Sequence, residues 1–449
     1  MELSGQKVLI IGLGKTGLAT ARFFAGRDVS LVVTDEKPEK EIEALCLSEG
    51  IHRGLKIARY DRSSLSQVDF VVPSPGVPPF NPILEEARMR GIGIISEIEL
   101  AYRFLPCPII AITGSNGKTT TTTLIGDILQ RAGKKVFVGG NIGDPLIGFV
   151  SGGHDADFAV VEVSSFQLQW IEHFCPSVAI LLNTTCDHIN YHGTFDAYRE
   201  VKERIFENQT RSHLAILNAD ETSSRLLSRK LKARIGFFSS TSAVEEGMFV
   251  ADDKLVYIKS SRERETYPLD MVRIRGRHNL ENIMAAIMAV REWGVTPPDI
   301  IGAVADFKGL SHRIEFAGEK GGVAFYDDSK GTNVGAVARA LESFSQPVFL
   351  LMGGRDKDGD FETLAPLIKE KVKELVLFGE AREKIFLLIG GIVPTLSVAA
   401  LRDAVTVAYD HASAGEIVLL SPGCASFDEF SDYKARGDYF QKFVGAINE

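Results

Sequence analysis

The sequence has few cysteines, and these do not form a recognisable framework. Its 449 residues contain five cysteines, which are odd in number, widely scattered and never spaced as C-x-x-C. Disulfide-bonded domains and structural zinc sites need a regular spacing of cysteines. We therefore expect reduced thiols and a cytoplasmic location.

Long apolar runs and an excess of positive charge are also missing. The longest apolar stretches, such as VFLLMGG at 348–354, are far shorter than a helix that crosses a bilayer. In the opening MELSGQKVLIIGLG a short apolar stretch runs directly into a glycine turn, so we expect no signal peptide. The formal net charge is -9, which gives no overall positive field for a polyanion. We expect neither membrane insertion nor a nucleic-acid partner.

The chain is too long for a single hydrophobic core, and its strand pattern divides it into α/β segments. The first opens with KVLIIGLGKTG, an apolar run that stops at glycines and continues into the helical pattern LATARFFAGRD. The strands SLVVTD and DFVVPSPG follow, and strands separated by helical stretches predict a parallel sheet covered on both faces. We expect a Rossmann-like domain over residues 1–96.

A second segment begins near residue 97. Pro106 and Pro108 end the helical pattern SEIELAYRF, and a new apolar strand follows them. Further strands are FAVVEVSS, SVAILLNTT and HLAILNAD, while GRHNLENIMAAIMAVREWG has apolar residues at helical spacing. We expect a central α/β domain with a parallel-rich sheet over residues 97–309.

The strand pattern restarts after GLSHRIEF. Four strands with helices between them, in VAFYDDSKGTN, PVFLLMGG, ELVLFGE and EIVLLSPG, predict a Rossmann-like C-terminal domain over residues 310–449. The candidates for chemistry lie at or just beyond strand ends, where open parallel sheets hold their ligands.

The sharpest local signal is the segment 114–120, GSNGKTT, which follows the strand IIAIT. Its glycines permit a tight turn whose N–H groups point at phosphate oxygens, and the helix that follows adds the positive end of its dipole. Lys118 can then neutralise the outer phosphates while the Thr119 hydroxyl reaches a magnesium ion. Ile112 replaces the first glycine of the usual pattern, so we expect a shortened loop. We therefore expect the central domain, residues 97–309, to be of the P-loop ATPase type. The predicted ATP-binding residues of this loop are Gly114, Asn116, Gly117, Lys118, Thr119 and Thr120.

Three more residues are candidates for a metal and phosphate site. Glu162 ends the strand FAVVE, and His188 follows the next strand in NTTCDHINYH. A carboxylate and a neutral imidazole suit a metal ligand or a phosphate contact, and each also suits a hydrogen-bonded structural residue. Lys202 lies in the helical pattern FDAYREVKERIFEN, where a lysine taken alone is typical of a solvent-exposed face.

The amino-terminal glycine pattern leaves two alternatives open. Gly12, Gly14 and Gly17, with Asp35 about twenty residues later, fit the dinucleotide fingerprint. Any diphosphate carried on a nucleoside can use the same turn and helix end. The pattern therefore supports either a nicotinamide cofactor or a uridine diphosphate sugar.

Taken together, the motifs resemble those of the Mur ligases along essentially the whole chain. They occur in the family's order as IGLGKTG, SPGV, ITGSNGKTT, GGNIG, VEVSSFQL, NTTCDHINYH, YREVKERIF, GRHNLENIMAA, LSHRIEF, DDSKGTN, GGRDKDGDF and SPGCASFDEF. The nucleotide-loop motifs are shared with folylpolyglutamate ligases and so indicate the superfamily. DDSKGTN and SPGCASFDEF resemble the branch of the family that adds D-glutamate.

The resemblance implies one substrate for each domain. The first would hold the UDP of the muramoyl-alanine precursor of peptidoglycan, the second ATP with two magnesium ions, and the third D-glutamate. It also implies that carbon dioxide carbamylates Lys202, which turns an ammonium into a carboxylate-like metal ligand. The implied catalytic residues are Lys118, Glu162, His188 and Lys202, and the implied metal contacts are Thr119, Glu162, His188 and Lys202.

Further site residues follow from the resemblance, position by position. The ATP site would include Asn279, Asn282, Arg313 and Asp328. The UDP substrate would contact Gly14, Lys15, Thr16, Asp35, Glu36, Lys37, Ser74, Gly76, Asn141, Ser164 and His188. D-Glutamate would contact Lys330, Thr332, Lys357, Ser426, Phe427 and Tyr433. Tyr433 stands where phenylalanine is common in the family, and Arg355 and Asp356 add charges beside Lys357.

The implied reaction is ATP-dependent amide formation through an acyl phosphate, by a monomer, in the peptidoglycan synthesis on which cell shape and division depend. Phosphorylation of a carboxylate creates a good leaving group, and closure of the third domain would keep water from the intermediate. Three alternatives stay open. They are a sister ligase with another amino acid or a folate acceptor, a nicotinamide-dependent dehydrogenase, and a nucleotide-gated binding protein without ligase activity.

Overall fold

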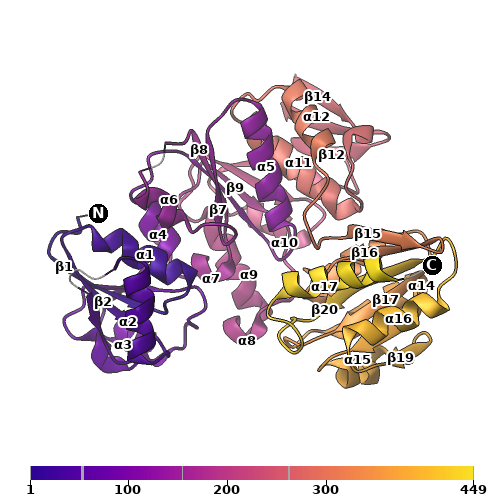
Figure 1. Ribbon diagram of the computed structural model, residues 1–449. Helices are drawn as coiled ribbons and strands as arrows, with labels where there is room; N and C mark the ends of the chain where they lie inside the picture. The colour runs from indigo at the N-terminus through magenta and orange to yellow at the C-terminus, as the bar shows by residue number, and fades with distance from the viewer. Residues whose placement is uncertain (1, 52–54, 154, 261–262, 448–449) are drawn as a thin grey trace.

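Three α/β domains, each built around its own sheet, follow one another along the chain (Figure 1). This computed structural model describes residues 2–51, 55–153, 155–260 and 263–447. In Figure 1 the first and third domains lie on either side of the middle domain. Among the described residues, every helix is too short or too polar to cross a bilayer. The expectation of three α/β domains is confirmed.

The first sheet is parallel, with the strand order β3-β2-β1-β4-β5. In this register Ile11, at the end of β1, is opposite Pro73 at the end of β4, so the residues that follow both strands are neighbours. The strand order reverses between β1 and β4, and this is where such sheets bind ligands. The elements are β1 (Gln6–Ile11), α1 (Lys15–Ala25), β2 (Val29–Thr34), α2 (Glu39–Ser48), β3 (Leu55–Ile57), η1 (Arg62–Leu65), β4 (Phe70–Pro73), α3 (Pro82–Met89) and β5 (Gly93–Ile94).

The middle sheet has nine strands in the order β14-β13-β12-β11-β10-β9-β6-β8-β7. Strands β7 to β12 run parallel, and β12, β13 and β14 form an antiparallel end. The strands are β6 (Ile109–Thr113), β7 (Val136–Gly140), β8 (Phe158–Glu162), β9 (Val178–Leu181), β10 (Leu214–Asn218), β11 (Arg234–Ser239), β12 (Gly247–Ala251), β13 (Lys254–Ser260) and β14 (Glu263–Pro268).

Helices cover the middle sheet and connect its strands. Apolar residues of α5 and α11 pack against one face of the sheet in a single buried core with β6, β8 and β9. The helices of this domain are α4 (Glu97–Tyr102), α5 (Lys118–Arg131), α6 (Leu146–Ser151), α7 (Ser165–Leu168), α8 (Ile189–His192), α9 (Phe195–Glu203), η2 (Arg204–Phe206), α10 (Thr222–Ser228), η3 (Leu269–Met271), α11 (Arg277–Arg291) and α12 (Pro297–Asp306).

The third sheet has the order β15-β16-β20-β17-β18-β19, in which β15 alone is antiparallel to its neighbour. The sequence pattern predicts four strands here and misses the two edge strands β15 and β19. The elements are β15 (Glu315–Lys320), β16 (Val323–Asp327), α13 (Val334–Glu342), β17 (Val348–Gly353), η4 (Phe361–Leu364), α14 (Ala365–Lys371), β18 (Val372–Phe378), α15 (Arg382–Ile389), β19 (Thr395–Ser397), α16 (Leu401–His411), β20 (Ile417–Gly423) and α17 (Tyr433–Ala446).

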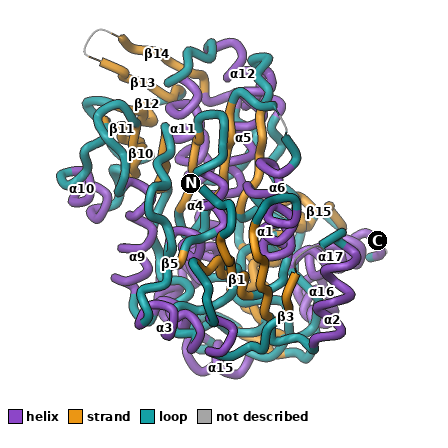
Figure 2. The backbone as a smooth tube through the Cα atoms, turned by 90° about the vertical axis from the view of Figure 1, so that its left-hand side faces the viewer, coloured by secondary structure: helices purple, strands orange, loops and turns teal. Residues whose placement is uncertain are grey.

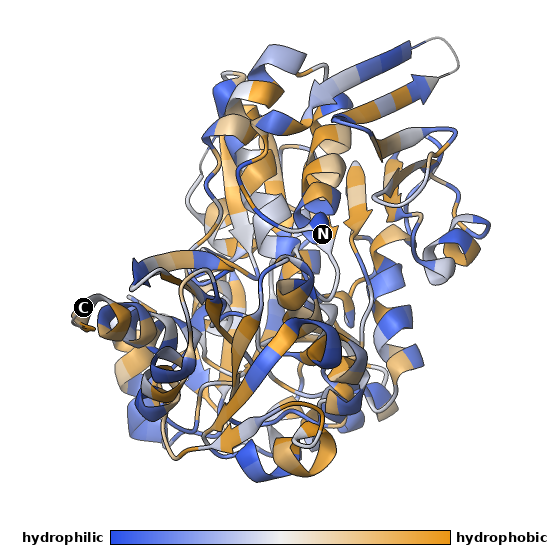
Figure 3. Ribbon diagram, turned by 90° about the vertical axis from the view of Figure 1, so that its right-hand side faces the viewer, coloured by the Kyte–Doolittle hydropathy of each residue, from blue (hydrophilic) through white to orange (hydrophobic). Residues whose placement is uncertain are grey.

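Two of the edge strands, β14 and β15, are polar, which explains why an apolar pattern does not reveal them. β14 has the sequence ERETYP and is largely hydrophilic in Figure 3, and β15 has the sequence EFAGEK. Charged residues at a sheet edge discourage pairing with another chain. The buried central strands, such as β6 and β17, are continuous apolar runs, as strands of a parallel sheet covered on both faces should be.

The first and middle domains share a hydrophobic core. Helix α1 lies beside α6 in both Figure 1 and Figure 2, and α4 packs on α6. One buried cluster contains Phe23 and Phe24 of α1 together with Leu100 of α4 and Leu146 and Ile147 of α6. The third domain has two core clusters of its own, and all of their residues lie after position 313.

Candidate active site

A loop of residues 114–117 joins β6 to α5 at the switch point of the middle sheet. The register places Ile112 opposite Glu162 of β8 and Thr113 opposite Leu181 of β9, so the loop lies between the ends of three strands. Gly117 has φ of 86°, and a Cβ there would collide with Oδ1 of Asn282 on α11. Glycine is therefore required at 117, both for the turn and for the close approach of α11.

Lys118, the first residue of α5, has its ammonium turned back onto this loop. Its Nζ donates to the carbonyl oxygens of Gly114 at 2.7 Å and Ser115 at 2.9 Å. Burial lowers the pKa of Lys118, while the carboxylates of Glu162 and Asp187 act in the opposite direction. A cation thus lies where the loop amides and the α5 dipole favour a phosphate.

Glu162 ends β8 with one carboxylate oxygen engaged and one free. The residue is only 2% exposed, and its Oε1 accepts a hydrogen bond of 2.8 Å from Asn141 Nδ2. Its Oε2 is buried and has no hydrogen-bond partner among the described residues. A buried carboxylate oxygen without a partner is costly unless a ligand satisfies it, and a hard divalent cation is the ligand that carboxylates prefer.

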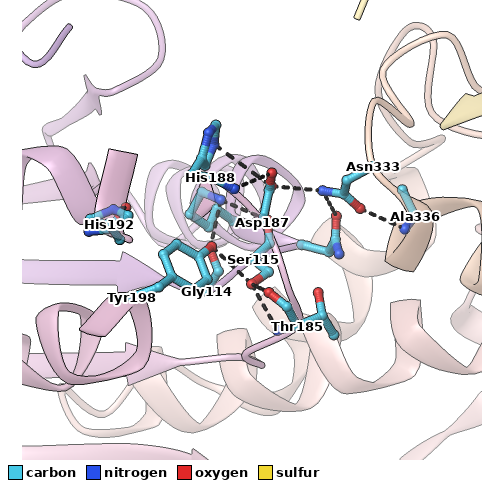
Figure 4. A network of polar contacts seen from close by, with 12 residues as sticks. Gly114, Ser115, Thr185, Asp187, His188, His192, Tyr198, Asn333 and Ala336 are labelled. Atoms are coloured by element: carbon cyan, nitrogen blue, oxygen red, sulfur yellow. Dashed lines mark hydrogen bonds and ion pairs between the residues drawn. The ribbon is translucent and has the colours of Figure 1, made fainter. Parts of the chain in front are cut away.

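His188 is held in an unusual backbone conformation in the loop after β9. Its φ is 54°, which is rare for a residue with a side chain, and its N–H donates to Oδ1 of the preceding Asp187 at 2.9 Å (Figure 4). Burial lowers the pKa of His188, with Asp187 opposing and nearby lysines adding to the effect. The imidazole is therefore neutral near pH 7, which is the form that binds metals.

Lys202 is buried, and the expectation that a lone lysine on this charged helix faces solvent is wrong. The residue is 2% exposed, its Nζ donates to Gly114 O at 2.9 Å, and it lies 4.6 Å from the centre of the Tyr198 ring. The ammonium of Lys118 donates to the same carbonyl oxygen. Burial, and then the charge of Lys118, lower the pKa of Lys202 well below its ordinary value.

A cavity of about 680 Å³ opens between the middle and third domains. It is within the size range of small-molecule sites. Arg313 of the third domain crosses the cleft, and its Nη2 donates to Thr119 Oγ1 at 2.8 Å. Burial raises the pKa of Asp328 to about 7. The predicted ATP residues that line the cavity are Asn116, Gly117, Thr120, Asn279, Asn282, Arg313 and Asp328.

A second cavity, of about 480 Å³, lies between the first and middle domains. The predicted UDP residues that line it are Gly14, Lys15, Thr16, Asp35, Glu36, Ser74, Gly76 and Asn141. Three predicted residues lie outside its lining. Lys37 pairs with Asp35 at 3.4 Å, Ser164 forms the capping box of α7 with Gln167, and His188 belongs to the loop described above.

Asp35 is engaged by the glycine loop itself. Its Oδ2 accepts from Leu13 N at 2.5 Å, and its Oδ1 accepts from Lys37 N at 3.1 Å. Burial raises the pKa of Asp35, but these hydrogen bonds outweigh it, and the net effect is a lowered pKa. The carboxylate that would bind a ribose in a dinucleotide site is instead part of the turn.

The predicted D-glutamate residues gather at one edge of the third sheet. Lys330, Lys357 and Ser426 follow β16, β17 and β20, which are neighbours in the sheet. Lys330 Nζ is 3.8 Å from the centre of the Tyr433 ring. Burial, and then Arg313, lower the pKa of Lys330 to about 8. Thr332 is partly buried, whereas Phe427 is 60% exposed and is not enclosed by the described residues.

The extra charges beside Lys357 are paired with other side chains. Arg355 Nε donates to Glu380 Oε2 at 3.0 Å, and Asp356 forms an ion pair with Lys384. Asp356 Oδ1 also accepts from Lys357 N at 2.7 Å. Both charges are therefore locally compensated, and Lys357 keeps its own ammonium available.

Comparison with known proteins identifies the family. Three family patterns match in succession, described as "Mur ligase MurD-like, N-terminal domain" over residues 6–96, "Mur ligase middle domain" over 112–290 and "Mur ligase, glutamate ligase domain" over 312–424. The chain is 58% identical over 449 residues to UDP-N-acetylmuramoylalanine--D-glutamate ligase of Syntrophus aciditrophicus, covering 100% of this chain and 99% of that protein. It is 45% identical, with the same coverage, to the protein of that name from Geotalea daltonii. The chain belongs to the Mur ligase family.

Solved structures of Mur ligases and related enzymes have the same fold. UDP-N-acetylmuramate-alanine ligase from Thermotoga maritima aligns with a TM-score of 0.60 at 18% identity, covering 98% of this chain and 99% of that one. A pseudomurein peptide ligase from Methanothermus fervidus aligns with a TM-score of 0.62 at 18% identity, covering 99% and 100%. Membership of the Mur ligases replaces the alternative of a nicotinamide-dependent dehydrogenase.

The sequence pattern misses several residues that the Mur ligase fold brings into this site. Asp187 contacts His188 and reaches the third domain, Tyr198 holds Ser115 through a 3.0 Å contact between their hydroxyls, and Asn183 pairs with the backbone of Asn116. His278 lines the nucleotide cavity with a buried Nδ1 that has no partner among the described residues. Asp187 and Asn183 lie in the quoted strand-end motifs, but their partners Asn333 and Asn116 are far away in the sequence.

Proposed function

We propose that this chain is an ATP-dependent ligase that joins D-glutamate to UDP-N-acetylmuramoyl-L-alanine, with ADP and phosphate as products, in peptidoglycan precursor synthesis. Relatives that match the whole chain carry the name of this ligase. One structural observation supports the assignment most. Asn141 lines the cavity of the first domain and also donates to Glu162, so a single side chain connects the proposed sugar-nucleotide site with the proposed phosphoryl-transfer site.

The proposed reaction has two steps. The carboxylate of the muramoyl-alanine attacks the terminal phosphorus of ATP, the bond between that phosphorus and the ADP oxygen breaks, and an acyl phosphate forms. The amine of D-glutamate then attacks the acyl carbon and loses a proton, while phosphate leaves. Direct attack on a carboxylate would have to expel oxide, so phosphorylation replaces one forbidding step with two feasible ones.

The residues of the nucleotide loop would orient the transferring phosphoryl group. Lys118 would move from the Gly114 and Ser115 carbonyls to the phosphate oxygens, since its ammonium already lies beside the loop. Arg313, which reaches Thr119 from the third domain, would close over the same phosphates. Asn279 and Asn282, at the start of α11, line the same cavity, which supports a contact with the nucleotide.

The donor set fits divalent cations, and we propose that two magnesium ions are held here. Glu162 Oε2 lacks a partner and the His188 imidazole is neutral, so both suit a cation, together with the Thr119 hydroxyl. Magnesium, when bound, would offset negative charge on the transferring phosphoryl group.

Carbamylation of Lys202 is supported by its surroundings. Two ammonium groups, those of Lys118 and Lys202, point at the single Gly114 carbonyl oxygen, and like charges this close disfavour each other. A lowered pKa increases the fraction of neutral amine, which is the form that adds to carbon dioxide and releases a proton. The product is a carbamate anion, which would relieve the repulsion and add a metal ligand.

The third domain would supply D-glutamate. Lys330, Thr332, Lys357, Ser426, Phe427 and Tyr433 are the proposed contacts, and the charges of Glu162 and Lys118 act on Lys330, so this edge faces the middle domain. We propose that the chain acts as a monomer. Five free cysteines support a cytoplasmic location.

Phosphate release with defined substrates tests this proposal. Purified protein with ATP, magnesium and UDP-N-acetylmuramoyl-L-alanine should release phosphate when D-glutamate is added. L-Glutamate should give little release, because Lys330, Thr332 and Ser426 are expected to select the D configuration. Equal release with both enantiomers would contradict the assignment of these residues.

A sister ligase with the same chemistry and another amino acid is the second candidate. The shared nucleotide loop and Glu162 are compatible with either. A panel of amino acids in the same assay distinguishes them, because a sister ligase would respond to a different member of the panel than D-glutamate.

A further inference from the structure

The third domain contacts the catalytic loops of the middle domain through the first turn of α13. Asn333 is the N-cap of this helix, and its Oδ1 accepts from Ala336 N at 2.8 Å. Its Nδ2 points the other way and donates to Asp187 Oδ2 across the domain boundary at 3.0 Å (Figure 4). One amide side chain therefore starts a helix in one domain and holds a carboxylate in the other.

Gly335, in the same turn, lies against two more residues of the middle domain. A Cβ at this position would be 3.0 Å from Thr185 Oγ1 and 3.3 Å from Asn116 Nδ2. Nothing in the helix itself requires glycine here, since the described φ values in the left-handed region do not include Gly335. The missing side chain is explained by the close approach of the two domains.

The residues that this turn touches belong to the loops that surround the phosphate site. Asn116 is part of the nucleotide loop, and Thr185 and Asp187 lie within the three residues before His188. Asp187 uses Oδ1 to accept from His188 N at 2.9 Å, and its Oδ2 lies 3.7 Å from His188 Nε2. The Asn333 amide thus fixes the carboxylate that accepts from the His188 backbone and lies beside its ring.

We propose that residues 333–335 are a docking tip that positions His188 through Asp187 when the third domain closes. Asn333 and Gly335 are positioning residues in this account. The proposal rests on the proposed ligase function for its link to the amino acid, because Lys330 and Thr332 directly precede the tip. Binding of D-glutamate by these two residues would place the tip, and the tip would complete the arrangement of the metal-binding loop.

The contact leaves two polar side-chain atoms of the middle domain unpaired. Asn116 Nδ2 and Thr185 Oγ1 are buried and have no hydrogen-bond partner among the described residues, and both face Gly335. Buried polar groups without partners disfavour the state that contains them. The docked arrangement therefore gains little on its own, and substrates that bind across the two domains are needed to favour it.

Three variants test the tip. Asn333→Asp keeps the N-cap oxygen but places a carboxylate against Asp187. Asn333→Ser keeps an N-cap but is too short to contact Asp187. Gly335→Ala adds a methyl group that meets Thr185 and Asn116. Gly445→Ala is the matched control, since it is a helical glycine of the same domain whose added methyl has no atom within 4 Å.

Steady-state kinetics of the full-length enzyme give the first readout. Asn333→Asp and Gly335→Ala should lower kcat about tenfold or more, because the first places two carboxylates together and the second pushes the tip away from the loops of the middle domain. Both should also raise the magnesium concentration needed for half-maximal rate. Asn333→Ser should lower kcat less, and Gly445→Ala should match wild type. A kcat within about twofold of wild type for both Asn333→Asp and Gly335→Ala would overturn the proposal.

Amide hydrogen exchange of residues 184–192 gives a second readout that needs no turnover. In Gly335→Ala the amides of this segment should exchange faster than they do in wild type or in the control Gly445→Ala, because the tip no longer covers the segment. Alanine favours helix, so this variant is expected to fold even if Asn333→Asp does not. Identical exchange in all three proteins would refute docking. If wild type has no ligase activity but Gly335→Ala still exchanges faster in this segment, the proposed function is refuted and the docking tip is not.

Discussion

The two interfaces of the middle domain differ in their chemistry. The first domain joins it through a shared apolar core, in which α1 and α4 pack on α6. The third domain meets it through polar contacts such as Arg313 to Thr119, Asn333 to Asp187 and Arg339 to Glu281. Apolar burial holds surfaces together permanently, whereas a few polar contacts can be exchanged for water or ligand. We infer that the first interface is rigid and that the second opens and closes during the reaction.

The largest effect is expected from breaking the shared core. Phe23 of α1 is fully buried, and its ring centre lies 5.3 Å from that of Phe104, which follows α4. Phe23→Ala should lower the free energy of unfolding by about 3–5 kcal/mol, because it leaves a cavity in a core that two domains share. Unfolding in denaturant, monitored in each domain by amide hydrogen exchange, measures this change in free energy.

Phe344→Ala is the matched control for the third domain. Phe344 is equally buried but belongs to a core cluster of that domain alone. It should lower the stability of the third domain and leave the first two unchanged. If either variant lowered the free energy of unfolding of all three domains together, the proposed difference between the two interfaces would be contradicted.

A pH effect is expected next, at Glu97 in the first interface. Glu97 is 1% exposed, its Oε1 accepts from Ile147 N at 2.6 Å, and burial raises its pKa to about 7. The unfolded chain loses this proton near pH 4.3, so between about pH 4.3 and 7 only the folded state holds it. The free energy of unfolding should therefore fall by about 4 kcal/mol as pH rises through this window.

Glu97→Gln tests this effect, because glutamine has no proton to lose. The variant should lack this part of the pH dependence when unfolding is compared at about pH 5 and about pH 8. If wild type and variant lose stability in parallel over this range, Glu97 is not the group responsible.

A loss of activity without a loss of stability is expected at Lys202, beside the second interface. Lys202→Ala should lower the rate about hundredfold, because even the partners of metal ligands typically contribute about 10- to 100-fold. A small carboxylate such as formate should restore part of the activity by replacing the carbamate. Full activity without any supplement would rule out the carbamylated lysine.

The smallest effect is expected at Arg313, which spans the second interface. Arg313→Lys keeps the charge but loses the planar donor pair, and we expect KM for ATP to rise about tenfold. The melting temperature should stay close to that of wild type, because the contact is polar and not part of a core. An unchanged KM would show that Arg313 does not close over the nucleotide.

The sequence predicts the central strands and the residues at their ends, because buried parallel strands are continuous apolar runs. Glu162 at the end of β8 and the loop after β6 are of this kind. The polar edge strands β14 and β15 carry no such signal. Neither does the burial of Lys202, which depends on the path of α9 to Gly114, 88 positions away.

Contacts between domains are the features that local patterns predict least. Asn333 and Asp187 are 146 positions apart, and each has a sufficient local role as a cap or turn residue. Only the folded chain brings them together. The family resemblance identifies the motifs that contain these two residues, but it does not predict the hydrogen bond between them.

Trapping of the activated intermediate with hydroxylamine tests the central claim most directly. Purified protein, ATP, magnesium and UDP-N-acetylmuramoyl-L-alanine, with hydroxylamine in place of the amino acid, should yield the muramoyl-alanine hydroxamate together with ADP. Formation of ADP and phosphate during turnover with D-glutamate, but no hydroxamate under trapping conditions, would contradict an acyl phosphate held between the nucleotide loop and the amine site.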